Sequence, residues 1–242
     1  MKKQTPDTEN KKEEPGYIGH RQRLKARFLA DGGKSMPEYE LLELLLMYAI
    51  PRQDVKPLAK KILQEYYNLA NVLVAPSTEL VKSKGVGVNV AVLCGLIHIC
   101  AKKICWENLF NRDVPVLSDK KRLAEYCRAS IGYAQEEQLQ VIYLDIHGQY
   151  IQDNVEQVGT IGAVMISPRD IVSKALDYKA SRVIIAHNHP SGSCTPSKAD
   201  IDMTKQVKEA LKTVQIILED HIIISPREYY SMKEHLPFMN IN

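Results

Sequence analysis

Two histidines and an aspartate in the C-terminal half of the chain have the types and spacing of a metal site. His187 and His189 follow the run Arg-Val-Ile-Ile at residues 182–185, which is typical of a buried strand. Residues i and i+2 of a strand face the same side, so both imidazoles can meet at one point. Asp200 falls in the first turn of a predicted helix, where the helix dipole favours an ionised carboxylate. Two neutral imidazoles and a carboxylate make a three-ligand zinc set with a fourth position open to water, as in catalytic zinc sites.

A purely structural explanation fits the same residues. Ser197 and Asp200 have the S-x-x-D spacing of a capping box, in which both side chains satisfy free N–H groups at a helix start. A strand that ends in two histidines is also an ordinary polar strand edge. From spacing alone, the metal site and the helix cap stay open as alternatives, because short motifs recur by chance.

This stretch resembles a known family signature. His-x-His, then a serine, then an aspartate three residues after it is similar to the signature of the JAMM metalloproteases, the catalytic members of the MPN-domain group. The run HNHPSG at 187–192, with P-S-x-x-D at 196–200, resembles more closely the RadC family of bacterial proteins. Two further segments, 41–46 and 55–59, are similar to the N-terminal part of that family.

The resemblance implies a zinc-dependent hydrolase whose target is an amide or isopeptide bond of a protein or peptide substrate. Zn²⁺ held by His187, His189 and Asp200 would polarise the carbonyl and supply hydroxide. Ser197 would hydrogen-bond the oxyanion, although the helix cap makes a competing demand on its hydroxyl. Asp220-His221 resembles a recurrent pair of the family; it is either an element that orients a ligand or a polar strand entry.

Such a site needs a general base, and two glutamates compete for that role. Glu137 stands two residues before the predicted strand 139–144, which resembles the RadC pattern of a glutamate, one residue and an apolar strand. Glu156, ahead of Gly159-Thr160, is the alternative. We favour Glu137, whose structural explanation is an exposed charge at a strand mouth.

The segment from residue 19 to about residue 107 is helical in pattern, and we expect 16–110 to form an all-α, helix-hairpin-helix-like domain. Gly85 and Gly87 open an apolar helix and resemble the hairpin of such a module; they form either a phosphate-binding turn or a packing turn. Four basic residues between 21 and 27 are either a DNA-contacting face or a solvated helix face. The alternative function is therefore a DNA-binding protein linked to repair or recombination, with the metal domain in a processing or regulatory role.

Composition and the remaining sequence pattern indicate where the protein is located and whether it meets a membrane. Net charge is +3, and five cysteines without a C-x-x-C pair indicate a reduced, cytoplasmic protein. Residues 1–15 are expected to be a disordered tail, and the apolar run 90–100 is too short to span a bilayer, so no membrane partner is expected. The sequence does not determine the oligomeric state.

Residues 117–242 are expected to form the metal-binding domain, after a boundary at 111–116. Strands are predicted at 139–145, 150–151, 154–159 and 163–166, and two closing strands, 214–218 and 221–225, are predicted to join at Glu219-Asp220. Helices are predicted from Ser118, after Ser167 and over 198–212. This order gives an α/β sandwich around a mixed sheet, in agreement with the cytidine-deaminase-like architecture that the JAMM resemblance implies.

Overall fold

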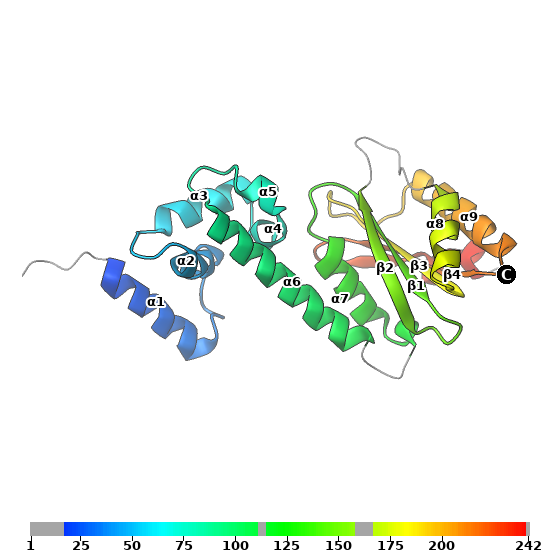
Figure 1. Cartoon of the computed structure of the whole chain (residues 1–242), viewed down its shortest axis with the longest axis horizontal. Helices are drawn as coiled ribbons and strands as arrows, with labels where there is room; N and C mark the ends of the chain where they lie inside the picture. The colour runs from blue at the N-terminus through cyan, green and yellow to red at the C-terminus, as the bar shows by residue number, and fades with distance from the viewer. Residues whose placement is uncertain (1–16, 111–114, 158–166, 241–242) are drawn as a thin grey trace, which may run out of the picture. The chain divides into compact units, whose positions relative to one another are not determined.

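The computed structural model describes residues 17–110, 115–157 and 167–240 (Figure 1). They form two compact units, and the long helix α6, Val88–Phe110, belongs to both: Cys94 and the residues after it group with the C-terminal unit. The predicted boundary stays a prediction, since residues 111–114 lie outside the described ranges. The predicted tail 1–15 and strand 163–166 also lie outside them.

The N-terminal unit is helical, as predicted. The leucine-rich segment forms the buried helix α2, because Leu42 and Leu46 are fully buried on one side of it. A loop that contains Gly85 leads into α6. The φ angle of Gly85 is +97°, a backbone conformation that glycine adopts without strain. The helices before α6 are α1 Tyr17–Asp31, α2 Glu38–Ala49, α3 Lys56–Tyr66, α4 Leu69–Val74 and α5 Ser77–Leu80.

Helix α6 is longer than the sequence pattern indicated. It has 23 residues and, among the described residues, is the one helix long and apolar enough to cross a membrane by length and composition. The expectation that this apolar stretch is too short to span a bilayer is therefore wrong, because the helix continues past residue 100 to Phe110. Buried helices of other proteins meet the same two criteria, so length and composition do not place α6 in a membrane.

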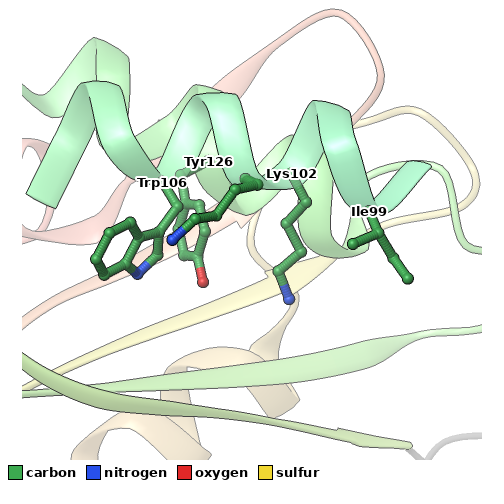
Figure 2. A pocket seen from close by; sticks show the side chains of 5 residues that line it. Ile99, Lys102, Trp106 and Tyr126 are labelled. Atoms are coloured by element: carbon green, nitrogen blue, oxygen red, sulfur yellow. The ribbon is translucent and has the colours of Figure 1, made fainter. Parts of the chain in front are cut away.

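An aromatic cluster attaches the C-terminal part of α6 to the rest of its unit. Trp106 meets the ring of Tyr150 edge-on at 5.8 Å, and Phe110 meets the ring of Tyr126 edge-on at 5.0 Å. Beside this cluster is a hollow of about 270 Å³, shown in Figure 2. Its lining residues are Ile99, Lys102, Lys103, Trp106 and Tyr126.

The C-terminal unit is built on a five-stranded mixed sheet with the order β2-β1-β3-β4-β5. Only the β3–β4 pair is parallel; β1 runs antiparallel to both β2 and β3, and β5 antiparallel to β4. This confirms the predicted α/β fold with a mixed sheet. The strands are β1 Gln138–Leu144, β2 Tyr150–Gln157, β3 Arg182–Asn188, β4 Ile217–Ile224 and β5 Tyr229–Ser231.

Helices cover both faces of this sheet, and strand alternation separates two cores. Val141, Val183 and Ile185 face helices α8, Pro168–Asp177, and α9, Lys198–Thr213. Ile142, Ile184 and Ala186 face α7, Lys120–Ile131. The short helices η1 Val116–Ser118, α10 Met232–His235 and η2 Pro237–Asn240 complete the unit.

The predicted division of the segment 214–225 into two strands was wrong. β4 is continuous through Glu219-Asp220, but its register against β3 shifts there: Val183 pairs with Leu218, whereas Ile184 pairs with Asp220. Glu219 is therefore the extra residue of a β-bulge, and residues beyond it change faces. The acidic pair looks like a turn in the sequence, yet its side chains are satisfied within the sheet. The predicted strands at 150–151 and 154–159 likewise belong to one strand, β2, as far as Gln157; residues 158 and 159 lie outside the described ranges.

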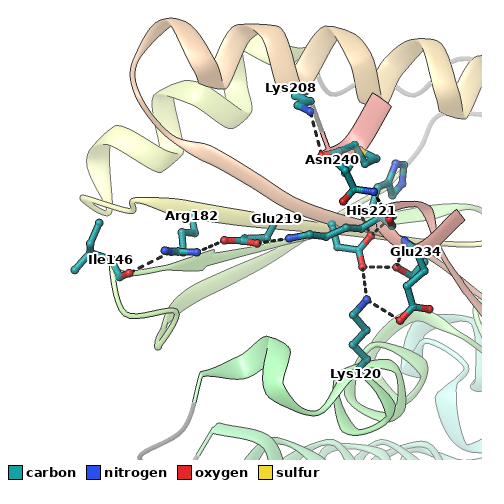
Figure 3. A network of polar contacts seen from close by, with 12 residues as sticks. Lys120, Ile146, Arg182, Lys208, Glu219, His221, Glu234 and Asn240 are labelled. Carbon is teal, nitrogen blue, oxygen red and sulfur yellow. Dashed lines mark hydrogen bonds and ion pairs between the residues drawn. The ribbon is translucent and has the colours of Figure 1, made fainter. Parts of the chain in front are cut away.

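Two cations hold the bulged glutamate (Figure 3). Glu219 is 4 % exposed, accepts a hydrogen bond from Lys233 Nζ at 2.8 Å and forms an ion pair with Arg182. Burial alone would raise the pKa of Glu219, but the hydrogen bonds and charges of Lys233 and Arg182 outweigh it and hold that pKa below its ordinary value. The ion triad therefore stabilises the bulge while Glu219 is ionised.

We expect Glu219→Gln to lower the free energy of unfolding at pH 7 by about 1–3 kcal/mol, because two cations lose a charged acceptor. The folded-state pKa lies below the ordinary 4.5, so the loss is full above about pH 5 and shrinks as pH falls through the folded pKa. Denaturant unfolding of both proteins at a series of pH values from 7 down to about 3 measures the difference. A difference that stays constant over this range would contradict the role of the ionised carboxylate.

Candidate metal centre

Strand β3 brings the two predicted histidines to one side of the sheet. Its odd-numbered residues Val183 and Ile185 face the α8–α9 core, so His187 and His189 continue along that face. Their Nε2 atoms are 2.9 Å apart. His187 is 3 % exposed and His189 is partly buried. The two imidazoles therefore point at a common position over the end of β3.

The start of α9 supplies the carboxylate. Ser197 is the N-cap: its Oγ accepts from the backbone N–H of Asp200 at 3.1 Å, and its own N–H donates to Asp200 Oδ2 at 2.7 Å. This is the capping box that the sequence offered as the alternative to a metal site. The two explanations are compatible here, because the cap holds the Asp200 carboxylate facing the histidines.

The three predicted ligands converge. Asp200 Oδ1 is 3.3 Å from His187 Nε2, and Oδ2 is 3.5 Å from His189 Nε2. One ligand atom from each residue lies within 4.8 Å of the others, and this is the one such group among the described residues. Three atoms with lone pairs at this separation form a site for a metal cation.

The charges at the site interact strongly. Burial alone would raise the pKa of Asp200, but its close contacts with His187 and His189 and their charges hold that pKa far below its usual range. The hydrogen bond with Asp200 is also the main cause that raises the pKa of His189. The carboxylate is therefore ionised, and a metal cation would have to displace a proton from His189.

The hydrogen-bond partner of His189 fixes which ring nitrogen is free. Nδ1 of His189 lies 2.7 Å from the carbonyl oxygen of Ser193, which can only accept, so Nδ1 carries the hydrogen. The neutral ring then keeps its lone pair on Nε2, the nitrogen that faces Asp200. The loop between β3 and α9 thus orients His189 so that its Nε2 faces the other two candidate ligands.

The register of β1 against β3 shows which of the two candidate general bases lies near the histidines. Leu139 pairs with His187, so continuing this antiparallel register places Glu137 opposite His189, on the same face. Glu137 is exposed, and its charge contributes to the raised pKa of His189. Glu156 pairs with Leu139 from the far side of β1 and forms an ion pair with Lys174. The structure therefore brings Glu137, and not Glu156, beside the histidines.

Ser197 can serve both of the uses predicted for it. In the cap its oxygen is an acceptor, which leaves the hydroxyl hydrogen free to donate. The cap therefore does not use this hydrogen, and the oxyanion contact of Ser197 stays a prediction.

Sequence reasoning missed the part played by Asn188. It is fully buried on the α7 face; its Oδ1 accepts from the N–H of Gln138 at 2.6 Å and its Nδ2 donates to the carbonyls of Ala134 and Glu136. These bonds tie the segment that carries Glu137 to the strand that carries the histidines. A polar residue between two candidate ligands, in a strand buried on both faces, was the available signal.

A mixed sheet between helical layers, with this His-x-His strand end and a capped aspartate, defines a metal-binding domain of the JAB/MPN class. Residues 117–236 match the family model described as the RadC-like JAB domain. A relative named UPF0758 protein, from Rhodobacter capsulatus, is 40% identical over 201 residues, which is 83% of this chain and 93% of the relative. The chain belongs to the RadC family.

We expect the purified protein to hold about one metal ion per chain and the double variant His187→Ala, His189→Ala to hold almost none, since one carboxylate alone binds weakly. Elemental analysis after gel filtration measures the content. His147→Ala is the matched control, because His147 is an exposed histidine on the β1–β2 hairpin. Equal metal content in the double variant and the control would place the metal elsewhere.

Proposed function

We propose that this protein is a zinc-dependent hydrolase of JAMM type that cleaves an amide or isopeptide bond of a protein or peptide. The observation that carries the proposal is the convergence of His187, His189 and Asp200. Glu137 is close enough to His189 for its charge to raise the pKa of that imidazole, and Ser197 caps the helix that carries Asp200. JAB domains are related to metal-dependent hydrolases, which supports this reaction class.

The spacing of the ligand atoms is compatible with zinc. Zinc bonds of about 2.0–2.1 Å in a tetrahedron separate neighbouring ligand atoms by about 3.3 Å. Asp200 Oδ1 is 3.3 Å from the imidazole of His187, the other oxygen, Oδ2, is 3.5 Å from that of His189, and the two imidazoles are 2.9 Å apart. Three protein ligands from two nitrogens and one oxygen leave a tetrahedral position open.

The residues of this chain divide the chemistry between them. Bound zinc would polarise the scissile carbonyl and lower the pKa of water so that hydroxide is available near neutral pH. Glu137 would accept the proton of the attacking water and return it to the leaving amine. The Ser197 hydroxyl would donate to the developing oxyanion, held in place by the α9 cap.

Glu137→Gln tests this assignment. With the zinc-loaded full chain and pools of fluorogenic peptides and lysine-linked isopeptides, we expect the variant to lower kcat by roughly 10²- to 10⁴-fold. Glu156→Gln makes the same chemical change one strand away and should leave kcat near that of the wild type. Zinc content should be equal in all three proteins. Loss of activity in the Glu156 variant alone, or no cleavage of any pool by the wild type, would contradict the proposal.

A second candidate function is DNA binding by the N-terminal unit, favoured by the glycine turn at Gly85 before α6. The basic residues of α1 give this candidate less support. Arg21 donates to the backbone carbonyls of Met47, Ile50 and Gln53, and Arg27 pairs with Glu40. Two of the four basic side chains therefore stabilise the helical unit itself.

If this unit binds DNA, the affinity should fall linearly with salt on logarithmic axes, with a slope that counts the phosphate contacts. Fluorescence anisotropy of the full chain with labelled single-stranded, duplex and branched DNA measures that slope. Because Arg21 and Arg27 are engaged internally, we expect a shallow slope of about two to four contacts. The absence of binding to all three DNAs at low salt would remove this candidate.

A further inference from the structure

A third histidine lies directly behind the candidate metal centre. Nε2 of His221, on β4, is 2.7 Å from Nδ1 of His187. Nδ1 of His221 is 2.5 Å from Oγ1 of Thr204, on α9, and this oxygen is 2.5 Å from the backbone oxygen of Asp200. His221 and Thr204 are fully buried. The contacts therefore form a closed path from one ligand, His187, to another, Asp200.

The carbonyl oxygen of Asp200 sets the direction of the hydrogens along this path. A carbonyl accepts and never donates, and two oxygens 2.5 Å apart without a hydrogen between them would repel. The single hydroxyl hydrogen of Thr204 therefore lies on its contact with Asp200. Met232 Sδ, 3.4 Å from the same hydroxyl, is a weaker acceptor. The Thr204 oxygen must then accept from Nδ1 of His221.

The positions of the hydrogens on His221 and His187 follow from the bond that Thr204 accepts. A neutral imidazole has one N–H, so His221 with its hydrogen on Nδ1 has a lone pair on Nε2. That lone pair accepts from Nδ1 of His187, so Nε2 of His187 keeps its own lone pair, and the hydrogen in its 2.9 Å contact with Nε2 of His189 belongs to His189. Burial disfavours a charged His221, which would carry a second N–H. The β-bulge at Glu219 gives His221 this position, because it turns His221 onto the face of His187.

We propose that Thr204 and His221 are positioning residues that set the tautomer of His187 before a metal ion arrives, so that its Nε2 lone pair faces Asp200 and His189. The inference rests on the proposed function for the use of this site. A hydrogen on Nε2 would block coordination by His187. Most metal-ligating histidines donate their second N–H to a carboxylate, a carbonyl or water. Here His187 donates to His221 instead. His221 in turn donates to Thr204, whose hydroxyl donates to the backbone carbonyl of Asp200.

A matched pair of variants isolates the hydroxyl. Thr204→Val keeps the branched shape and removes the hydroxyl, which frees His221 to adopt the other tautomer; Thr204→Ser keeps the hydroxyl and loses a methyl group. We expect the valine variant to bind zinc roughly 10- to 100-fold more weakly, measured by competition with a chromophoric chelator, and the serine variant to bind like the wild type. Equal affinity of the valine variant and the wild type, or an equal loss in both variants, would overturn the proposal.

The tautomer of His187 can also be measured without any variant at Thr204. In the metal-free wild type labelled with ¹⁵N-histidine, long-range proton–nitrogen correlation should show His187 and His221 protonated at Nδ1 and not at Nε2. The assignment uses single histidine replacements. A metal-free His187 with its hydrogen on Nε2 would overturn the proposal even if Thr204→Val does not fold.

These readouts separate this proposal from the proposed function. A protein with the expected tautomers and the expected valine–serine difference in zinc affinity, but without cleavage of any peptide pool, would keep the positioning role and lose the hydrolase. A cleaving enzyme in which the valine variant binds zinc like the wild type would keep the hydrolase and lose the positioning role.

Discussion

Side-chain alternation along β3 decides what each residue of the candidate metal centre does. His187 and His189 face α9 and its aspartate, whereas Asn188 faces the opposite side and ties down the segment that carries Glu137. A slip of one residue in the pairing with β1 would exchange these faces, and the histidines would point into the α7 core. The flanking apolar residues prevent that slip, because both faces of the strand are buried.

The first turn of α9 uses the same atoms to cap the helix and to orient the Asp200 carboxylate. The capping box satisfies N–H groups that every helix start leaves unpaired, and it orients the Asp200 carboxylate toward the imidazoles. The Asp200 carbonyl then anchors Thr204 one turn later. Helix formation and site formation are therefore coupled, since displacing the carboxylate breaks its hydrogen bond with the Ser197 N–H, which is one half of the cap.

The bulge in β4 determines on which face of the sheet His221 lies. Without the extra residue, His221 would face α7 instead of His187, because Leu218 before the bulge already faces the α9 side. The bulge leaves Glu219 out of step, and Arg182 and Lys233 stabilise it there. An ion triad at the sheet thus supports a hydrogen bond to a candidate ligand.

Local spacing in the sequence singled out the three candidate ligands, the cap at Ser197 and the α/β class, because strand and helix periodicity fix side-chain direction over a few residues. Spacing alone left a metal site and a helix cap as alternatives, and the family resemblance favoured the metal site. The bulge, the full length of α6 and the roles of Asn188 and Thr204 needed the tertiary structure. His187 and His221 are 34 positions apart, and their contact depends on the pairing of β3 with β4. Periodicity says which way a side chain points, but only the packed sheet decides what it meets there.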